Sequence, residues 1–502
     1  MRADRGRAAL CLALLLALLL SGCRQAPSTQ PLQDFALPEP EAVEAAIRGE
    51  QVDAGRYEAT LYYLTSDGTD FAPEQHAIYP EPDRPLAETV LRELLTPPGG
   101  SGQLAVVPSE TQLLAVECAG GTVTVQLSVD ARGVQTDQEL YLMYAAISAT
   151  LLELEGVRGV NVLIDGQSEA VYRLPVGVFC GTSETLVSAL AQLQAESDRF
   201  LGGDSTTRGT LARNALLYYP SASSDLVLPE TRAIAFSDEN YAAALIEAMR
   251  DGPQTAGGCL PPFPAGLEVL AATPNTFVSE RGERVLDLAF TELLDEYLRS
   301  AGITSSQFAA AVTLTMCSFV PELDGVRITI GEELMTETTL AGATISLADG
   351  IQTRELYSDS IGSSIRLYFA GREGGLAAVE RVVPQASATS PRLMLEQLFF
   401  GPVAGETTES ALPGGVSALD VLGVSVTDGL ARVNLSGNFY RQCQQLSAQQ
   451  ERNAAYAIVN TLCRLDTVNG VHLIIEDSDA ELLIDSIYLG SMLMYNPGIV
   501  EE

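Results

Sequence analysis

The pattern of apolar and polar residues repeats three times along the chain. Each copy begins with a short run rich in aliphatic and aromatic residues, at 59–63, 215–219 and 365–369. Such runs, followed by a polar turn and a second extended piece, are typical of β-hairpins. Self-similarity at a fixed period indicates tandem domains, so the three copies are compared with one another below.

A helix is predicted next in each copy. Apolar residues recur at helical spacing from Leu86 to Leu95, from Tyr241 to Met249 and from Met394 to Phe399. This spacing places them on one face of a helix. Each helix is predicted to end at proline and glycine, in Pro97-Pro98, Gly252-Pro253 and Gly401-Pro402.

Two strands separated by a turn follow this helix. They are predicted at 113–117 with 123–127, at 267–270 with 285–288, and at 418–422 with 431–435. The second strand of a pair alternates well, as in Val123-Thr124-Val125-Gln126-Leu127. Alternation indicates one face on a core and the other towards solvent.

A second helix and a closing strand complete each copy. The helical stripes begin near Leu140, Phe308 and Ala455, and the closing strands begin at Gly159, Gly325 and Gly470. Each unit is therefore predicted to be β-β-α-β-β-α-β. Helices with one apolar face beside a half-exposed sheet make a two-layer α+β domain with its own core.

The remaining segments divide the chain into domains and linkers. A linking helix is predicted around 186–201, and a Pro/Glu-rich extended tether precedes the first copy. The predicted bounds are 1–22 for a signal peptide, 23–55 for the tether, 56–180, 210–340 and 364–490 for the repeats, 181–209 and 341–363 for the linkers, and 491–502 for a C-terminal tail.

The N-terminus is predicted to carry a lipid. Arg2, Arg5 and Arg7 precede an apolar run that is too short to span a bilayer, so the run is read as a signal peptide. The following Leu20-Ser21-Gly22-Cys23 resembles the lipobox of bacterial lipoproteins, in which the cysteine thiol receives a diacylglyceryl group. We expect Cys23 to anchor the mature chain to the extracytoplasmic face of the cell membrane. The alternative is an ordinary secretory signal with a chance cysteine.

Charge is the most unusual property of the composition. The chain has 65 Asp and Glu against 29 basic residues, a formal net charge of −36. It contains no lysine, so every basic side chain apart from histidine is arginine. Such a surface repels nucleic acid, which argues against nucleic-acid binding. It favours a basic partner or divalent cations, or else reflects an acidic proteome selected for solubility.

Six cysteines follow Cys23, two in each copy: Cys118 and Cys180, Cys259 and Cys317, and Cys443 and Cys463. Export would permit disulfides. The positions do not correspond between copies, apart from Cys317 and Cys463. The sequence therefore leaves free buried thiols and intradomain bridges equally open.

The order of these weak motifs resembles the GerMN domain of sporulation and spore-germination lipoproteins. The third copy matches best, through Gly401-Pro402, Leu412-Pro413, Val433–Ser436 and Asn438-Phe439. The middle copy is the most divergent, with an insertion around 261–264. The resemblance implies a fold similar to ring-building motifs of secretion-type assemblies, and a role in an envelope complex associated with spore peptidoglycan. A related domain occurs in actinobacterial lipoproteins that assist a sensor kinase.

Residues that could carry chemistry are few. His76 and His472 have no second histidine nearby in sequence to form a metal pair, and each is predicted to face solvent. The acid clusters Glu292-Asp295-Glu296 and Glu476-Asp477-Asp479 could cleave glycan or bind calcium, but lack EF-hand spacing. We interpret them as solvated acidic faces. We therefore expect no catalytic residue, no cofactor and no metal site.

The pairs Tyr62-Tyr63, Tyr218-Tyr219 and Tyr368-Phe369 recur at the same place in each copy. Adjacent strand residues point to opposite faces, so one of each pair should enter the core. The other could stack on a sugar ring, although the absence of tryptophan weakens that interpretation.

The sequence thus predicts a non-enzymatic, membrane-anchored scaffold that binds envelope proteins, in a sporulation or germination complex. The alternative is a lipoprotein that binds or modifies peptidoglycan. A solute-binding lipoprotein would need one cleft between two large lobes, which three small repeats do not offer.

Overall fold

The computed structural model describes residues 56–501, except 82–83, 101, 203–208, 256, 265–274, 477–480 and 485. The predicted signal peptide and Cys23 lie outside the described residues, as do the tether up to residue 55 and the predicted strand at 267–270.

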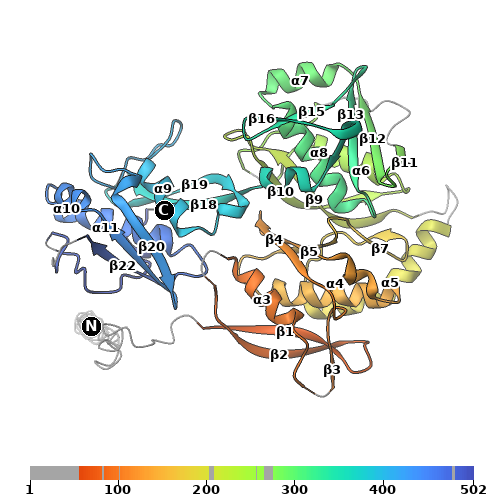
Figure 1. The fold of residues 1–502 in the computed structure, drawn as a ribbon, viewed down its shortest axis with the longest axis horizontal. Coiled ribbons are helices and arrows are strands. Elements are labelled where there is room, and N and C mark those ends of the chain that lie inside the picture. Colours follow the sequence, from red (N-terminus) through yellow and green to blue (C-terminus); the bar gives the residue numbers. More distant parts are fainter. Residues whose placement is uncertain are drawn as a thin grey trace, which may run out of the picture. The chain divides into compact units, whose positions relative to one another are not determined.

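Repeat 1 has the predicted order of elements (Figure 1). Its helices α3 and α4 pack against strand β1 and against each other. Its elements are β1 (Tyr57–Thr65), β2 (Phe71–Ile78), α3 (Leu86–Leu95), β3 (Gln103–Leu104), β4 (Leu113–Ala119), β5 (Thr122–Leu127), α4 (Asp137–Leu152) and β6 (Gly159–Ile164).

Helix α5 (Ser183–Gly202) lies where the linking helix was predicted, and it packs on its neighbours through the buried side chains of Leu186 and Phe200. The short strands β7 (Ala170–Val171) and β8 (Leu174–Pro175) precede it.

Repeat 2 follows the same order but divides its second helix. A short α7 precedes the buried α8. The elements are β9 (Leu211–Pro220), β10 (Val227–Phe236), α6 (Tyr241–Arg250), β11 (Asn275–Val278), β12 (Arg284–Phe290), α7 (Leu293–Ala301), α8 (Ser305–Phe319) and β13 (Gly325–Ile330).

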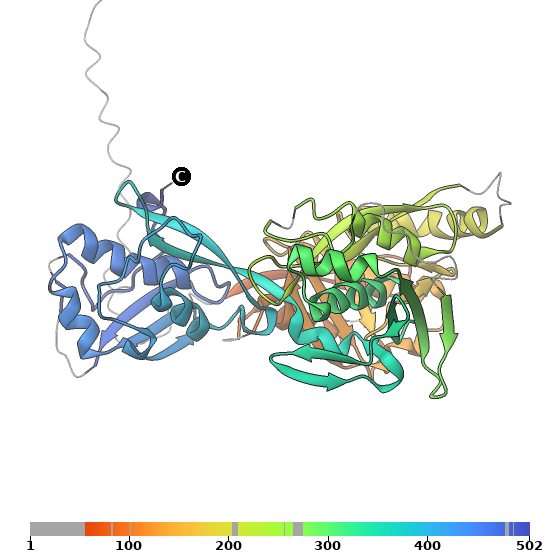
Figure 2. The same cartoon turned by 90° about the horizontal axis from the view of Figure 1, so that it is seen from above.

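The stretch after β13 adds further elements to repeat 2. Strand β14 (Glu333–Leu334) and strand β17 (Ile351–Thr353) both pair with β13. Between them, β15 (Glu337–Leu340) and β16 (Ala343–Ser346) form a hairpin, seen in Figure 2 as two teal strands at the edge of the repeat. Most of the predicted linker 341–363 therefore belongs to the packed body of repeat 2, which the 3-10 helix η3 (Glu355–Ser360) completes.

Repeat 3 again shows the predicted order. Like repeat 2, it has a short helix, α10, before the long second helix. The elements are β18 (Gly362–Ala370), β19 (Leu376–Pro384), α9 (Pro391–Phe400), β20 (Val421–Thr427), β21 (Leu430–Leu435), α10 (Gly437–Cys443), α11 (Ala448–Leu462) and β22 (Gly470–Ile475).

The same topology holds in all three repeats. The first two strands form an antiparallel hairpin, and a separate sheet has the orders β4-β5-β6, β11-β12-β13 and β20-β21-β22. The last two strands of each order run parallel. Parallel neighbours need a crossover connection, which the second helix of each repeat provides.

Hydroxyl side chains begin this second helix in every repeat. Thr136, Thr304 and Ser447 each accept a hydrogen bond from the backbone N–H three residues later. Thr304 and Ser447 complete a capping box with Gln307 and Gln450. The caps satisfy N–H groups that the first helical turn leaves unpaired.

Each repeat has its own core, as predicted. Three clusters of buried apolar residues centre on α4, α8 and α11. The cluster of repeat 2 also takes in Ala119, Leu174 and Val178 from repeat 1. Repeats 1 and 2 are therefore joined by apolar packing.

The prediction of a solvated sheet face is wrong for repeat 1. The polar residues Thr122, Thr124 and Asn161 of β5 and β6 are all at least 96% buried. Other parts of the chain cover them: Thr122 hydrogen-bonds Thr231 of β10 at 2.7 Å, and Arg354 reaches Glu117 of β4. The alternation of residues correctly identified the polar face of this sheet, but it could not show that another part of the chain covers that face.

The prediction holds better in repeat 3, where β21 alternates between half-buried and buried positions along its length.

Buried Glu451 makes repeat 3 sensitive to acid. Its carboxylate accepts hydrogen bonds from the backbone N–H groups of Ile484, Ser486 and Ile487 and from the Ser486 hydroxyl. Burial alone would raise the pKa of Glu451, but these hydrogen bonds outweigh it and lower the pKa below its ordinary value. The carboxylate therefore stabilises the fold above its unfolded-state pKa, and this contribution is lost as pH falls through the folded-state pKa.

We expect Glu451→Gln to cost about 2 kcal/mol of unfolding free energy at pH 7, because hydrogen bonds to a charged acceptor are lost. The difference from the parent chain should shrink as both are denatured at progressively lower pH. Urea titrations at pH 7 and pH 4 measure it. A deficit that stays constant with pH would contradict a role for the ionised form.

Candidate functional site

The two histidines lie in different repeats, and neither is fully solvent-facing. The His76 ring is half-buried, with Nδ1 3.1 Å from Glu93 Oε1 and Nε2 3.4 Å from a Glu74 oxygen. His472 is half-buried in β22, opposite Arg432 of β21. Within the described part of the chain, no group of three or more His, Cys, Asp or Glu side chains could hold a metal ion.

All six cysteines of the repeats are free thiols in the structure. Burial raises the pKa of the Cys118, Cys317 and Cys443 thiols to about 12. A thiol with such a pKa is protonated at neutral pH and is a poor nucleophile. These cysteines behave as small apolar core residues.

In repeats 2 and 3, both residues of the recurring aromatic pair lie in the core and offer no surface for stacking on a sugar ring. Tyr218, Tyr219, Tyr368 and Phe369 are all at least 99% buried. In repeat 1, Tyr63 is buried and Tyr62 is half-buried, and the Tyr62 hydroxyl hydrogen-bonds Glu153 at 3.0 Å.

The two acid clusters differ in their surroundings. Glu476 is exposed, and Asp477 and Asp479 lie outside the described residues. Glu292, Asp295 and Glu296 are exposed around α7, as expected for a solvated face. These three acids also line a hollow on the described part of the chain.

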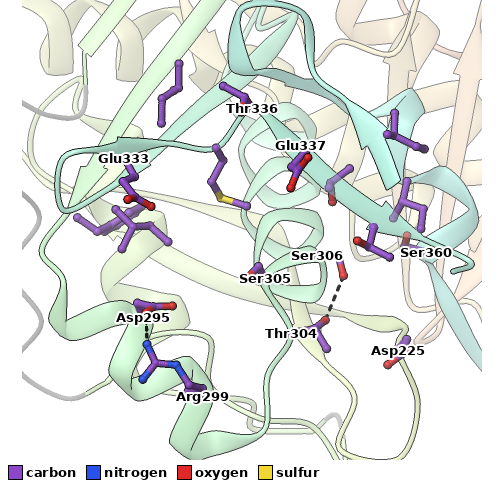
Figure 3. A pocket seen from close by; sticks show the side chains of 18 of the residues that line it. Asp225, Asp295, Arg299, Thr304, Ser305, Ser306, Glu333, Thr336, Glu337 and Ser360 are labelled. Atoms are coloured by element: carbon purple, nitrogen blue, oxygen red, sulfur yellow. Dashed lines mark hydrogen bonds and ion pairs between the residues drawn. The ribbon is translucent and has the colours of Figure 1, made fainter. Parts of the chain in front are cut away.

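This hollow, the α7 groove, is an open pocket of about 2310 Å³ that is lined by repeat 2, apart from Pro384 at the end of β19. In Figure 3, Asp295 and Arg299 of α7 lie on one side, and Glu333, Thr336 and Glu337 lie on the other. Thr304, Ser305 and Ser306, where α8 begins, lie between them. The β14 strand and the β15–β16 hairpin thus form a wall facing α7.

Carboxylates dominate the lining of the α7 groove. Eight acidic side chains and one arginine line it, a formal balance of −7. Arg299 forms an ion pair with Asp295, one helical turn away. Beside the acids lie apolar side chains, among them Leu293, which is 64% exposed, and Leu334, which is 37% exposed.

Sequence reasoning found only one wall of this groove. It singled out the α7 acids but interpreted them as a solvated acidic face. The opposite wall, Glu332 to Glu337, follows the closing strand, in a stretch of repeat 2 for which the sequence analysis predicted no helix or strand. The available signal was the acidic pair Glu332-Glu333 followed at once by the apolar pair Leu334-Met335, which is unusual for a solvated turn.

Among the residues that the structure describes, no helix is both long and apolar enough to cross a bilayer.

Comparisons with known proteins place the chain in a family. The Germane family, described as sporulation and spore germination, matches three times, at residues 60–170, 216–335 and 366–481. These matches cover well over half of the chain. No similar protein was found among curated sequences.

Solved structures show weaker likeness. The tandem GerMN domains of the sporulation protein GerM from Bacillus subtilis share 18% identity, over 59% of this chain and 99% of theirs, with a TM-score of 0.21. A putative lipoprotein from Clostridium perfringens shares 20% identity, over 25% of this chain and 88% of its own, with a TM-score of 0.17. The three family matches, rather than these structures, decide the assignment. The chain belongs to the Germane family and carries three tandem GerMN-like repeats.

Proposed function

We propose that this protein is a non-enzymatic scaffold, anchored by lipid on Cys23 to the extracytoplasmic face of the cell membrane, which holds protein partners in a sporulation or germination complex. The family match supports the setting. The residues around Cys23 support the anchor, through the short apolar run and the small side chains of Ser21 and Gly22.

One observation carries the scaffold proposal. Apolar packing and hydrogen bonds join repeats 1 and 2, whereas the described residues offer no metal-binding group and burial holds the thiols of Cys118 and Cys317 in their protonated form. Gln167 of repeat 1 hydrogen-bonds Asp324 of repeat 2 at 2.5 Å, and Glu322 N–H donates to the Ser168 carbonyl at 2.8 Å. Such contacts suit a platform that presents fixed surfaces.

Replacing Cys23 by serine tests the anchor. Without the thiol no thioether to diacylglycerol can form, so we expect the chain to leave the washed membrane fraction or to accumulate uncleaved. Fractionation of the native host with immunoblotting measures this. The matched control is Cys11→Ser, which removes the other cysteine of the leader and should change nothing. A Cys23→Ser chain that stays membrane-bound and normally cleaved would refute the anchor.

Crosslinking in the native host tests the scaffold. Because the chain lacks lysine, amine-reactive reagents find almost no target on it. A carbodiimide instead joins its carboxylates to lysines of other proteins. Because copies of the chain offer each other no lysine, adducts report other proteins. We expect defined envelope proteins to be captured during sporulation or germination. Capture of none, or release of muropeptides from cell wall by the chain from residue 24, would overturn the scaffold proposal.

A further inference from the structure

We propose that the α7 groove binds a cationic, amphipathic segment of a partner protein. This inference rests on the proposed scaffold function and names the chemistry of the partner.

The size of the groove favours a chain segment over a small molecule. Pockets for small ligands have volumes of roughly 300–1,000 Å³ and enclose most of the ligand. The α7 groove, at about 2310 Å³, is more than twice that size and is open. A peptide segment lying along it would fill this volume.

The charge of the groove selects a basic occupant. Of its eight carboxylates, Asp295 alone has a basic partner among the described residues. Glu292 and Glu296 face the groove from around α7, and Glu332, Glu333 and Glu337 face it from the opposite wall. Lysine or arginine side chains of a partner would reduce the repulsion among these carboxylates. The negative potential of the groove would also attract such side chains during association.

The apolar lining requires the occupant to be amphipathic. Leu293 and Leu334 expose large apolar side chains within the groove, and half-buried Met335 lies beside them. Covering this surface with leucine or phenylalanine side chains releases water from it. Methionine adapts to differently shaped apolar partners.

Three other occupants fit less well. An anion would be favoured by the first turn of α8, but Thr304 and Gln307 already cap that turn. A metal ion would need converging ligands, and the described residues contain no such group. A second copy of the chain would bring a further net charge of −36 into an acidic groove.

The β15–β16 hairpin distinguishes repeat 2, with its groove, from repeat 1. After its closing strand, repeat 1 has only β7 and β8, which have two residues each. In repeat 2 each hairpin strand has four residues, and β15 contributes groove lining along its length.

Fluorescence anisotropy tests the proposal with a labelled helical peptide that has leucine on one face and lysine on the other. The protein is the chain from residue 24, at low ionic strength. The main variant combines Glu332→Gln, Glu333→Gln and Glu337→Gln. These side chains are exposed, so the fold should be unaffected, as thermal melts will verify. Three exposed charge pairs with the peptide would be lost together, so we expect binding to weaken about tenfold.

A matched triple variant controls for overall charge. Glu184→Gln, Glu239→Gln and Glu280→Gln remove the same three charges from exposed positions outside the groove, and binding should change less than twofold. Leu334→Asn keeps the charge and should weaken binding about threefold or more, because it removes apolar contact. A scrambled peptide of the same composition should bind at least fivefold more weakly.

Several results would overturn the proposal. Equal weakening in both triple variants would mean general charge attraction, and equal binding of the scrambled peptide would exclude an amphipathic occupant. Displacement of the peptide by submillimolar Ca²⁺, with Ca²⁺ binding lost in the groove variant, would make the groove a cation site.

Carbodiimide capture in the native host separates this proposal from the scaffold function. A partner lysine joined to Glu332, Glu333 or Glu337 supports both. Partners joined only through carboxylates outside the groove would leave the scaffold standing and overturn the groove. Peptide binding at the groove, with no envelope protein captured, would support the groove chemistry and overturn the scaffold.

Discussion

Replacing Arg354 by alanine is expected to cost about 3–5 kcal/mol of unfolding free energy, because it leaves a buried carboxylate without its partner. Arg354 is 97% buried and forms an ion pair with Glu117 of β4, in repeat 1. Glu117 is itself 92% buried and also accepts a hydrogen bond from Gln126 at 2.9 Å. The pair therefore joins the end of repeat 2 to the sheet of repeat 1.

The loss should appear where repeats 1 and 2 meet. Urea unfolding of the chain from residue 24 gives the free-energy change. Hydrogen exchange, read by mass spectrometry, should show faster exchange in β4, β5 and β17. Arg372→Ala removes an exposed arginine and is the control, with an expected change below about 0.5 kcal/mol.

A double replacement distinguishes the cost of leaving Glu117 unpaired from the cost of losing the packing around Arg354. If the cost of Arg354→Ala comes from an orphaned Glu117, then Arg354→Met with Glu117→Met should recover most of the lost stability. A double variant as unstable as the sum of the two single variants would contradict this account. It would point instead to lost packing around the guanidinium stem.

Local patterns predicted the elements of this protein well. Helical spacing and proline and glycine stops act within a few residues, so the helix at Leu86–Leu95 could be predicted directly from the sequence. Repetition strengthened each prediction, because a strand or helix expected in one copy was expected in the other two.

Long-range pairing was beyond such patterns. Arg354 and Glu117 are separated by 237 positions in the sequence, and neither lies in a motif that indicates its partner. The polar side chains on β5 signalled solvent when read alone, because alternation does not say what covers a polar face. The α7 groove was missed for a similar reason: its two walls are separate acidic segments, and no local pattern in the sequence indicates that the two segments face each other.

Aligning the three repeats through their pairings reveals a substitution that the sequence pattern did not show. The partners Ala59–His76, Ala215–Arg232 and Ile365–Arg381 occupy the same place in each hairpin. Repeats 2 and 3 therefore have arginine where repeat 1 has histidine.

Each of these side chains lies near the second aromatic of the recurring pair. The His76 ring is centred 6.0 Å from that of Tyr63. Arg232 Cζ lies 5.7 Å from the Tyr219 ring centre, and Arg381 Cζ lies 5.6 Å from that of Phe369. The position therefore links the hairpin to the core in all three repeats.

The two arginines also close the end of the first helix. Arg232 donates to the Ala248 carbonyl at 2.8 Å and to the Gly252 carbonyl at 2.6 Å. Arg381 donates to the Gln397 and Gly401 carbonyls, both at 3.0 Å. Each also pairs with a glutamate, Glu230 or Glu406. A cation here satisfies carbonyls that a helix end leaves unpaired and opposes its partial negative charge.

Arg232→Ala should therefore cost about 3 kcal/mol of unfolding free energy, which is the lower end for a broken buried ion pair, because backbone N–H groups of Gln254 and Thr255 still bind Glu230.

In repeat 1, the opposite kind of change, His76→Arg, should stabilise the repeat by about 0.5–1 kcal/mol, because it places a permanent cation at the end of α3, near Glu93. Urea unfolding and hydrogen exchange of α3 and α6 measure both. Arg299→Ala, at an exposed ion pair, is the control and should change little. Destabilisation of α3 by His76→Arg would contradict this expectation. It would mean that the end of α3, which is followed by Pro97-Pro98 instead of Gly-Pro, cannot bind an arginine as the other two repeats do.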